Sequence, residues 1–438
     1  MKLRGLSTKW FWQKGLELMA KTVYVGMSGG VDSSVAAMLL VEQGYKVVGV
    51  YMKNWSEDLP GMKCPWAEDL ADAKRVAVKL RIDFEVWDFE KEYREKVVEY
   101  MLSEFKAGNT PNPDIMCNQE IKFKLFYEKA MKRGADFIAT GHYARTGQFE
   151  CVLSGTGPSR PSSRGSGPHT LAAASGLPRE KHSQLSQTRL MRAVDENKDQ
   201  TYFLYRISEK ALARTLFPIG EMTKPEVKKL AEKHGLHNAY KKESMGVCFV
   251  GEVGMKDFLK KYIDVQPGEI REIESENVLG YHEGAVFYTI GQRHGLYLSG
   301  EKGAVNDGMP YYVVKKDLKN NIVYVSKNLN DEHLWTDKLQ LKDIVLRQSE
   351  YILSGTGPSR LSSQGSGPHT SAAASGLPRE EYSRLPSILV RLRHRAPLVP
   401  AEFDGETLYF EHKIRRPASG QSAVIYDDGI CLGGGIII

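Results

Sequence analysis

The first third of the chain alternates apolar strand-like segments with amphipathic ones. Four β-branched, apolar segments predict buried strands at residues 22–25, 46–52, 84–89 and 135–140. Four segments with helical periodicity lie among them, at residues 34–43, 67–80, 91–106 and 119–132. Strands that alternate with helices of this length predict βαβ units and a parallel sheet, an α/β fold that binds ligands at the carboxyl ends of its strands.

The pattern changes in the second half of the chain. Residues 219–272 predict a small mixed domain with a helix at 225–234. Beyond it, short strands alternate with turn residues, at 285–290, 311–314, 322–325 and 422–426. This succession is typical of a β-barrel or a sandwich. We therefore predict three domains, which cover residues 19–218, 219–272 and 273–438.

Two distant stretches, residues 153–180 and 353–380, have nearly the same sequence, with 25 of 28 positions identical at an offset of 200. Both are rich in Gly, Ser and Pro. Ordering a residue costs about 1–2 kcal/mol, and burying a large aliphatic side chain returns only roughly 1.5–3 kcal/mol. With few such side chains, both inserts are predicted to be disordered. Because longer surface loops cost little closure entropy, deleting both is expected to leave activity intact.

Composition excludes several classes of protein. The 438 residues are 41% hydrophobic and 26% charged, as in soluble globular proteins. No apolar run approaches the ~18 residues of a membrane span, and five cysteines are too few for a disulfide-built secreted scaffold. We therefore expect a cytoplasmic protein that does not contact a membrane.

The net charge of +6 is misleading as a sign of nucleic-acid binding. Residues 1–18 contribute +3 and the two inserts +2 and +1, so the other 364 residues are neutral. Residues 1–18 lack the apolar core of a secretory signal and are interpreted as a dispensable extension, with organelle targeting as the alternative. Any argument for RNA must therefore rest on local sites.

A glycine-rich segment, GMSGGVDSS at residues 26–34, links the first predicted strand to the first helix. Adjacent glycines let the backbone approach an anion closely, and the N–H groups at a helix start favour phosphate. Asp32 either binds Mg²⁺ or caps the helix. Neither G-x-x-x-x-G-K-[ST] nor G-x-G-x-x-G is present. The segment instead resembles the loop of pyrophosphatase-loop ATP enzymes, in which chemistry occurs at the α-phosphate of ATP.

Two cysteines have surroundings suited to chemistry. Cys117 follows the segment NTPNPDIM, whose prolines predict a loop, and a helix that begins just after the thiol would lower its pKa. Cys248 lies in KKESMGVCFVG, where nearby lysines favour a thiolate. The alternative for each is a buried structural cysteine. Without a C-x-x-C pair, we expect no structural zinc site.

Eight segments together resemble the tRNA-specific 2-thiouridylase family. They are GMSGGVDSS, MKNW, NTPNPDIMCNQEIKF, ATGHYAR, ENKDQTYFL, GVCFVG, YTIGQRHGL and SGQSAVIYDDGICLGGG. The match covers about residues 20–150, 188–350 and 386–436. It implies a pyrophosphatase-loop nucleotide-binding domain, a small central domain and a C-terminal β-barrel. It also implies that ATP, with Mg²⁺, adenylates the C2 oxygen of the wobble uridine in tRNA, after which a persulfide sulfur replaces that oxygen.

The resemblance also assigns roles to individual residues. Cys248 would carry the persulfide, and Cys117 would attack its bridging sulfur to form a Cys117–Cys248 disulfide, unless the persulfide attacks C2 directly. Asp114 would serve in proton transfer. The ATP site would be lined by Gly26, Met27, Ser28, Gly29, Gly30, Val31, Asp32, Ser33, Met52 and Gly141. Contacts to tRNA would come from Asn112, Pro113, Asp114, Lys198, Asp199, Gln200, Arg393 and His394.

The arginines near the carboxyl end suggest a second RNA contact. If residues 390–395 form a strand, Arg391, Arg393 and Arg395 share one face suited to phosphates, or else form a solvated charged face. The family has an Arg followed by an aromatic residue here, whereas this chain has Arg393 followed by His394.

The expected partners are tRNAs of the Lys, Glu and Gln types and a sulfur carrier or cysteine desulfurase, with the protein a monomer. Two alternatives are another adenylating enzyme of the same loop family and an inactive tRNA-binding copy. An iron–sulfur cluster held by Cys117 and Cys248 is also left open.

Overall fold

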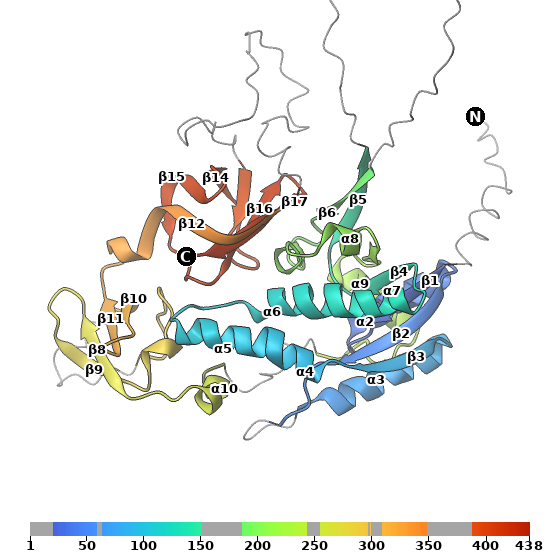
Figure 1. The fold of residues 1–438 in the computed structure, drawn as a ribbon, viewed down its shortest axis with the longest axis horizontal. Helices are drawn as coiled ribbons and strands as arrows, with labels where there is room; N and C mark the ends of the chain where they lie inside the picture. Colours follow the sequence, from blue (N-terminus) through green and yellow to red (C-terminus); the bar gives the residue numbers. More distant parts are fainter. Residues whose placement is uncertain are drawn as a thin grey trace, which may run out of the picture.

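The computed structural model describes residues 21–58, 64–150, 186–242, 255–296, 298, 309–347 and 388–438. Cys248, residues 1–18 and both inserts lie outside the described residues, so the expectations for them stay predictions. Figure 1 shows a sheet with helices on one side of the molecule, a small sheet at the opposite side and a barrel above it.

The first domain is built on a parallel sheet of five strands in the order β3-β2-β1-β4-β7, which confirms the predicted α/β fold. The strands are β1 (Thr22–Gly26), β2 (Lys46–Lys53), β3 (Asp83–Asp88), β4 (Phe137–Thr140) and β7 (Thr215–Leu216). Alternate residues of β1 face opposite sides, as strand geometry requires. Val23 and Val25 pack in one apolar cluster and Tyr24 in another, so helices cover both faces.

One face of this sheet is covered by α2 (Val31–Glu42), α3 (Trp66–Leu80) and α9 (Lys224–Lys233). The other face is covered by two long helical segments, which run side by side in Figure 1. The first consists of α4 (Glu90–Tyr93), the π-helical η1 (Arg94–Val98) and α5 (Glu99–Lys106). The second consists of α6 (Pro113–Met116), the π-helical η2 (Cys117–Phe126) and α7 (Tyr127–Lys132).

The second of these segments corrects a prediction. The expected helix at residues 119–132 begins earlier, at Pro113, so Cys117 lies one turn inside it and not ahead of it. Proline is well tolerated at the first helical position because its missing N–H would have no partner there. Asn112 caps the helix, since its Oδ1 accepts a hydrogen bond from the backbone N–H of Asp114 at 3.1 Å.

The central domain is a four-stranded sheet in the order β10-β11-β8-β9. Its strands are β8 (Gly268–Glu272), β9 (Val278–His282), β10 (Tyr312–Asp317) and β11 (Ile322–Ser326), and α10 (Met255–Tyr262) precedes them. A boundary at residue 272 would cut this sheet, so that prediction is wrong and the barrel begins only after β11. The strand expected at 285–290 is instead the 3-10 helix η4 (Ala285–Phe287), whose turn buries Ala285 and Tyr288 on one side.

The carboxyl-terminal domain is a β-barrel, as predicted, and six strands close it. The strands are β12 (Trp335–Leu346), β13 (Ile388–Arg391), β14 (Val399–Phe403), β15 (Thr407–Arg415), β16 (Ser422–Asp427) and β17 (Ile430–Ile437), and β12 pairs with β17 to close it. The hairpin of β5 (Arg145–Glu150) and β6 (Ser186–Met191) extends from the first domain and pairs with β17. The barrel is therefore joined to the first domain by backbone hydrogen bonds.

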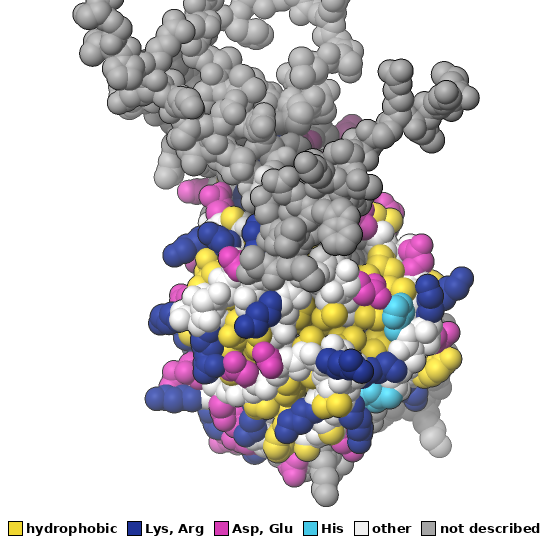
Figure 2. Space-filling model, turned by 90° about the vertical axis from the view of Figure 1, so that its right-hand side faces the viewer, with side chains coloured by type: hydrophobic (Ala, Val, Ile, Leu, Met, Phe, Trp, Pro, Cys, Tyr) yellow, Lys and Arg dark blue, Asp and Glu magenta, His cyan; other side chains and the backbone are white. Residues whose placement is uncertain are grey.

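Among the described residues, no helix is both long and apolar enough to cross a bilayer. On the face shown in Figure 2, basic and acidic side chains are interspersed. This distribution agrees with the neutral balance of the chain outside the extension and the inserts.

Candidate active site

The glycine-rich loop lies between β1 and α2, at the carboxyl edge of the parallel sheet. Gly29 adopts a φ of +77°, and Gly30 is the N-cap of α2. The hydroxyl of Ser33 donates to the carbonyl of Gly30 at 3.1 Å, and the N–H of Ser28 donates to the same hydroxyl at 3.2 Å. The loop is thus folded back on the helix start, where free N–H groups favour phosphate.

Close backbone approaches explain the glycines of this site. A Cβ on Gly29 would lie 2.3 Å from the backbone oxygen of Asp69, and a Cβ on Gly141 would lie 2.5 Å from the backbone nitrogen of Ser33. Met52 packs against Gly26, where a Cβ would be 2.8 Å from its Cε. The structure therefore brings together the segments expected to line the ATP site.

Asp32 does not cap the helix, so that interpretation is wrong. Its carboxylate accepts hydrogen bonds from Lys224 Nζ at 2.7 and 2.8 Å and from the hydroxyl of Tyr143 at 2.9 Å. Lys224 is buried, and Asp32 is 31% exposed at its side chain. A cation at Asp32 would have to displace Lys224, which would then be available to an anion beside the loop.

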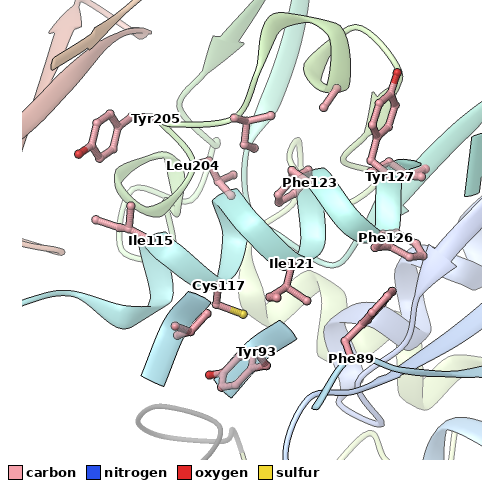
Figure 3. Packing of buried hydrophobic residues seen from close by; sticks show 14 of the residues in the cluster. Phe89, Tyr93, Ile115, Cys117, Ile121, Phe123, Phe126, Tyr127, Leu204 and Tyr205 are labelled. Carbon is pink, nitrogen blue, oxygen red and sulfur yellow. The ribbon is translucent and has the colours of Figure 1, made fainter. Parts of the chain in front are cut away.

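Cys117 lies in the apolar core and is 3% exposed. Figure 3 shows it on η2 among Ile115, Ile121 and Tyr93. In this conformation its thiol is covered, as in the alternative of a buried structural cysteine. Attack on a partner sulfur therefore requires the cover to move. The partner expected for it, Cys248, is not among the described residues, so the distance between the two cysteines is untested.

The helix of Cys117 lies beside the loop. Phe123 of η2 packs against His142 with ring centroids 5.8 Å apart, and His142 directly follows the Gly141 that touches the loop. The Nδ1 of His142 lies 2.8 Å from the hydroxyl of Thr140, and burial lowers the pKa of His142 well below its ordinary value. Burial raises the pKa of Asp114, which makes its carboxylate a stronger base.

The segment that leads into α6, residues 108–110, is held by hydrogen bonds from the two other domains. The N–H of Thr110 donates to the carbonyl of Ser419 at 2.7 Å, and Gln421 Nε2 donates to the carbonyl of Thr110 at 2.6 Å. From the central domain, Lys316 Nζ donates to the carbonyl of Gly108 at 2.6 Å. These bonds fix the chain just ahead of the residues expected to meet the target base, Asn112, Pro113 and Asp114.

Residues 198–200 lie between the barrel and the glycine-rich loop. The carboxylate of Asp199 has 0% exposure and pairs with Arg391 Nη1 at 2.7 Å. Gln200 and Tyr143 exchange two hydrogen bonds, at 2.8 and 2.9 Å. In this structure, Asp199 therefore offers no exposed atom to RNA, whereas Lys198 and Gln200 are half-buried.

The prediction that Arg391, Arg393 and Arg395 share one face of a strand is wrong. β13 ends at Arg391, and the chain then turns, with Arg395 at a φ of +63°. Arg391 is buried, while Arg393 and Arg395 are exposed. The ring centroids of His394 and Phe203 lie 4.5 Å apart with the rings tilted by 45°, so the histidine packs in an aromatic cluster. His394, which stands where the family has an aromatic residue, thus packs against aromatic rings as such a residue would.

Comparisons with known proteins match most of the chain. Family models match the tRNA methyl transferase HUP domain at residues 21–252, the tRNA methyl transferase PRC-barrel domain at 256–327 and the aminomethyltransferase beta-barrel domain at 377–437. The tRNA-specific 2-thiouridylase MnmA of Pseudomonas syringae is 42% identical over 421 residues, 95% of this chain and 94% of that protein. The chain belongs to the tRNA-specific 2-thiouridylase family.

A second member of the thiouridylase family, from Proteus mirabilis, is 40% identical over 423 residues, 95% of this chain and 97% of that protein. A solved NMN synthetase from Francisella tularensis overlaps 58% of this chain and 82% of that one, at 14% identity and a TM-score of 0.30. This last likeness is too weak to add to the argument.

Sequence reasoning missed three residues of this thiouridylase site. Lys224 and Tyr143 hold Asp32, and Asn238 Nδ2 donates to the carbonyl of Gly29 at 2.9 Å. A signal existed for Lys224, because a capping box of Thr223 and Glu226 opens α9 and puts this lysine at its first position. No local pattern indicated Tyr143 or Asn238.

The described residues contain no group of three or more His, Cys, Asp and Glu that could hold a metal ion. Asp32 is the acidic side chain of the loop, and it is already paired with Lys224. The donor set therefore does not form a resident metal site by itself. It fits a cation that arrives with the phosphates of a nucleotide.

Proposed function

We propose that the protein thiolates C2 of the wobble uridine in tRNA, at the expense of ATP. One observation carries the proposal, namely that Phe123 on the helix of Cys117 packs against His142, next to the Gly141 that touches the phosphate loop. A nucleotide on the loop and a base near Asp114 and Cys117 would then meet at one edge of the sheet. The relatives in Pseudomonas syringae and Proteus mirabilis, both tRNA-specific 2-thiouridylases, support this activity.

In the first step, the C2 oxygen of uridine attacks the α-phosphorus of ATP. The bond between the α-phosphorus and the oxygen that bridges to the β-phosphate breaks, and pyrophosphate leaves. Asp114 accepts the N3 proton, a role that suits a carboxylate whose pKa is raised by burial. The loop would hold the phosphates, and Mg²⁺ that arrives with them would neutralise part of their charge.

In the second step, sulfur replaces the adenylated oxygen and AMP leaves with it. Cys117 attacks the bridging sulfur of a persulfide on Cys248, so that a Cys117–Cys248 disulfide forms and hydrosulfide is released to C2. In the alternative order, the terminal persulfide sulfur attacks C2 directly. A sulfur carrier or cysteine desulfurase supplies the persulfide, and an external thiol reduces the disulfide.

The decisive experiment is mass analysis of wobble uridines from tRNA of the Lys, Glu and Gln types in a host that lacks its own thiolase. Complementation by this chain should restore 2-thiouridine, and the Cys117→Ser and Cys248→Ser variants should not. If the Cys117→Ser or the Cys248→Ser variant keeps full ATP-dependent adenylating activity, the result would instead favour another adenylating enzyme of the same loop family, which needs no cysteine pair. No consumption of ATP with tRNA and a sulfur donor would favour an inactive copy.

A further inference from the structure

A cavity of about 240 Å³ lies where the three domains meet. The loop before α6, the central sheet and the barrel each contribute walls. These walls are formed by Gly108, Asn109, Thr110, Ile290, Val314, Lys315, Lys316, Ala418 and Ser419. Nothing in the proposed adenylation or sulfur transfer uses this space.

Two lysines line the cavity, and Lys316, near the end of β10, is the half-buried one. Its Nζ donates to the carbonyl of Gly108 at 2.6 Å, and the described residues place no carboxylate within ion-pair distance of it. Lys315 stands beside it and is exposed. Burial lowers the pKa of Lys316 to about 8, so it is still mostly protonated at neutral pH. A half-buried cation without an acidic partner favours an anionic ligand.

The other polar walls are hydroxyl and backbone groups on a fixed frame. The hydroxyls of Thr110 and Thr289 lie 3.3 Å apart. Gly108 has a φ of +84°, and a Cβ on it would lie 2.4 Å from Cδ1 of Leu318. Thr110 is also held by the barrel through Ser419. The cavity is therefore built before any ligand arrives, which reduces the entropy lost on binding.

We propose that this cavity binds a phosphodiester group of the tRNA strand next to the target uridine, with Lys316 as its main ligand. The inference rests on the proposed function. Thr110, in a wall of the cavity, precedes Asn112 by two residues, so the Cα atoms of these two residues are at most about 7 Å apart. Proteins that hold single-stranded RNA combine a base pocket with basic groups that follow the backbone.

The test compares Lys316→Met with Lys319→Met, an exposed lysine in the turn after the same strand. Binding of an anticodon stem-loop RNA is measured by fluorescence anisotropy across a series of salt concentrations. Lys316→Met should lower the affinity several-fold and reduce the slope of log affinity against log salt by about 1. Lys316→Arg should keep most of the wild-type affinity and most of the wild-type salt slope. Lys319→Met should match the wild type.

A second measurement keeps the proposal testable if Lys316→Met folds poorly. Single methylphosphonates are placed at each phosphate that flanks the wobble uridine, and binding to the wild-type protein is measured. Neutralising one of these phosphates should weaken RNA binding to the wild type. The same modified RNA should bind a folded Lys316→Met or Lys316→Gln variant as tightly as the unmodified RNA does. The proposal is overturned if no flanking phosphate matters, or if the losses simply add.

The two levels of the proposal fail separately. A wild-type protein that forms 2-thiouridine while Lys316→Met keeps the wild-type salt slope would overturn the phosphate site alone. A wild-type protein that binds the stem-loop through Lys316 but forms no 2-thiouridine would support the phosphate site and overturn the proposed reaction.

Discussion

Arg391 is predicted to stabilise the joint between the barrel and the first domain. Its side chain is 5% exposed and lies 2.7 Å from the Asp199 carboxylate, which is 0% exposed. Removing one partner of a buried ion pair typically costs about 3–5 kcal/mol. Without Arg391, the Asp199 carboxylate would still lie 3.5 Å from Arg192 and accept a hydrogen bond from Thr201. We therefore expect a loss of stability at the lower end of this range, about 3 kcal/mol. Arg391→Met should then lower the melting temperature by roughly 6–12 °C, at about 2–4 °C per kcal/mol.

The assay is thermal unfolding of the full chain by calorimetry and circular dichroism, with midpoints compared, since several domains need not unfold in one step. Arg393→Met is the matched control. Arg393 is exposed two positions along the same segment, and its replacement should change stability by no more than about 0.5 kcal/mol. A midpoint for Arg391→Met within 1–2 °C of the wild type, on the order of the shift from about 0.5 kcal/mol, would refute the reasoning.

The ion pair itself is isolated by a double-mutant cycle with Asp199→Asn. If the two side chains stabilise the fold through each other, the double variant should lose clearly less than the sum of the single losses. Simple additivity would mean that Arg391 acts through packing, for example against the ring of Tyr426 at 5.5 Å from its guanidinium carbon. The Asp199 partner would then be incidental.

Three further predictions address the active site and its surroundings. Gly141→Ala should weaken ATP binding about tenfold in calorimetric titration, because its Cβ would meet the Ser33 nitrogen at 2.5 Å, whereas Gly429→Ala, in open space, should not. Burial lowers the pKa of His394 from 6.5 to about 4. As the pH falls from 6.5 to 4, the unfolded chain takes up the proton before the folded protein does. The free energy of unfolding should therefore decrease over this range by at most about 3 kcal/mol, and solvent screening makes the decrease smaller. His394→Phe should make stability depend less on pH over this range. A variant with the same pH profile as the wild type would contradict the prediction. Without substrates, Cys64, which is half-buried, should be alkylated before Cys117 in peptide mapping; the reverse order would show that the covered thiol opens readily.

The parallel sheet could be predicted because its signals are local. Strands buried on both faces appear as continuous apolar runs, and amphipathic helices separate them. The start of the helix at Pro113 was also available, since Asn112 as cap and proline at the first position form a recognised pair. The two π-helical stretches could not be predicted from the sequence, because over so few residues the spacing of apolar side chains does not distinguish a π-helix from an α-helix.

The candidate site could be predicted only as far as its parts are contiguous. The loop from Gly26 to Ser33 forms a recognisable sequence, but the partner of Asp32 lies 192 residues away. Burial is equally non-local. Arg391 and Arg393 looked equivalent along the chain, and only the position of Asp199 in the fold separates a buried arginine from an exposed one.

The tripeptide of Lys198, Asp199 and Gln200 shows why a motif does not assign one role to all its members. Asp199 points into the fold and holds Arg391 of the barrel, while Gln200 is bonded to Tyr143, whose hydroxyl holds Asp32 of the loop. Substitutions here must therefore be judged by two measurements. Asp199→Asn should lower the melting temperature and weaken RNA binding only through the fold, whereas Lys198→Met should weaken RNA binding with a smaller change in the melting temperature, because Lys198 is half-buried and Asp199 is buried. Within one tripeptide, Asp199 therefore serves the joint between domains, while Lys198 is the side chain expected to serve the ligand.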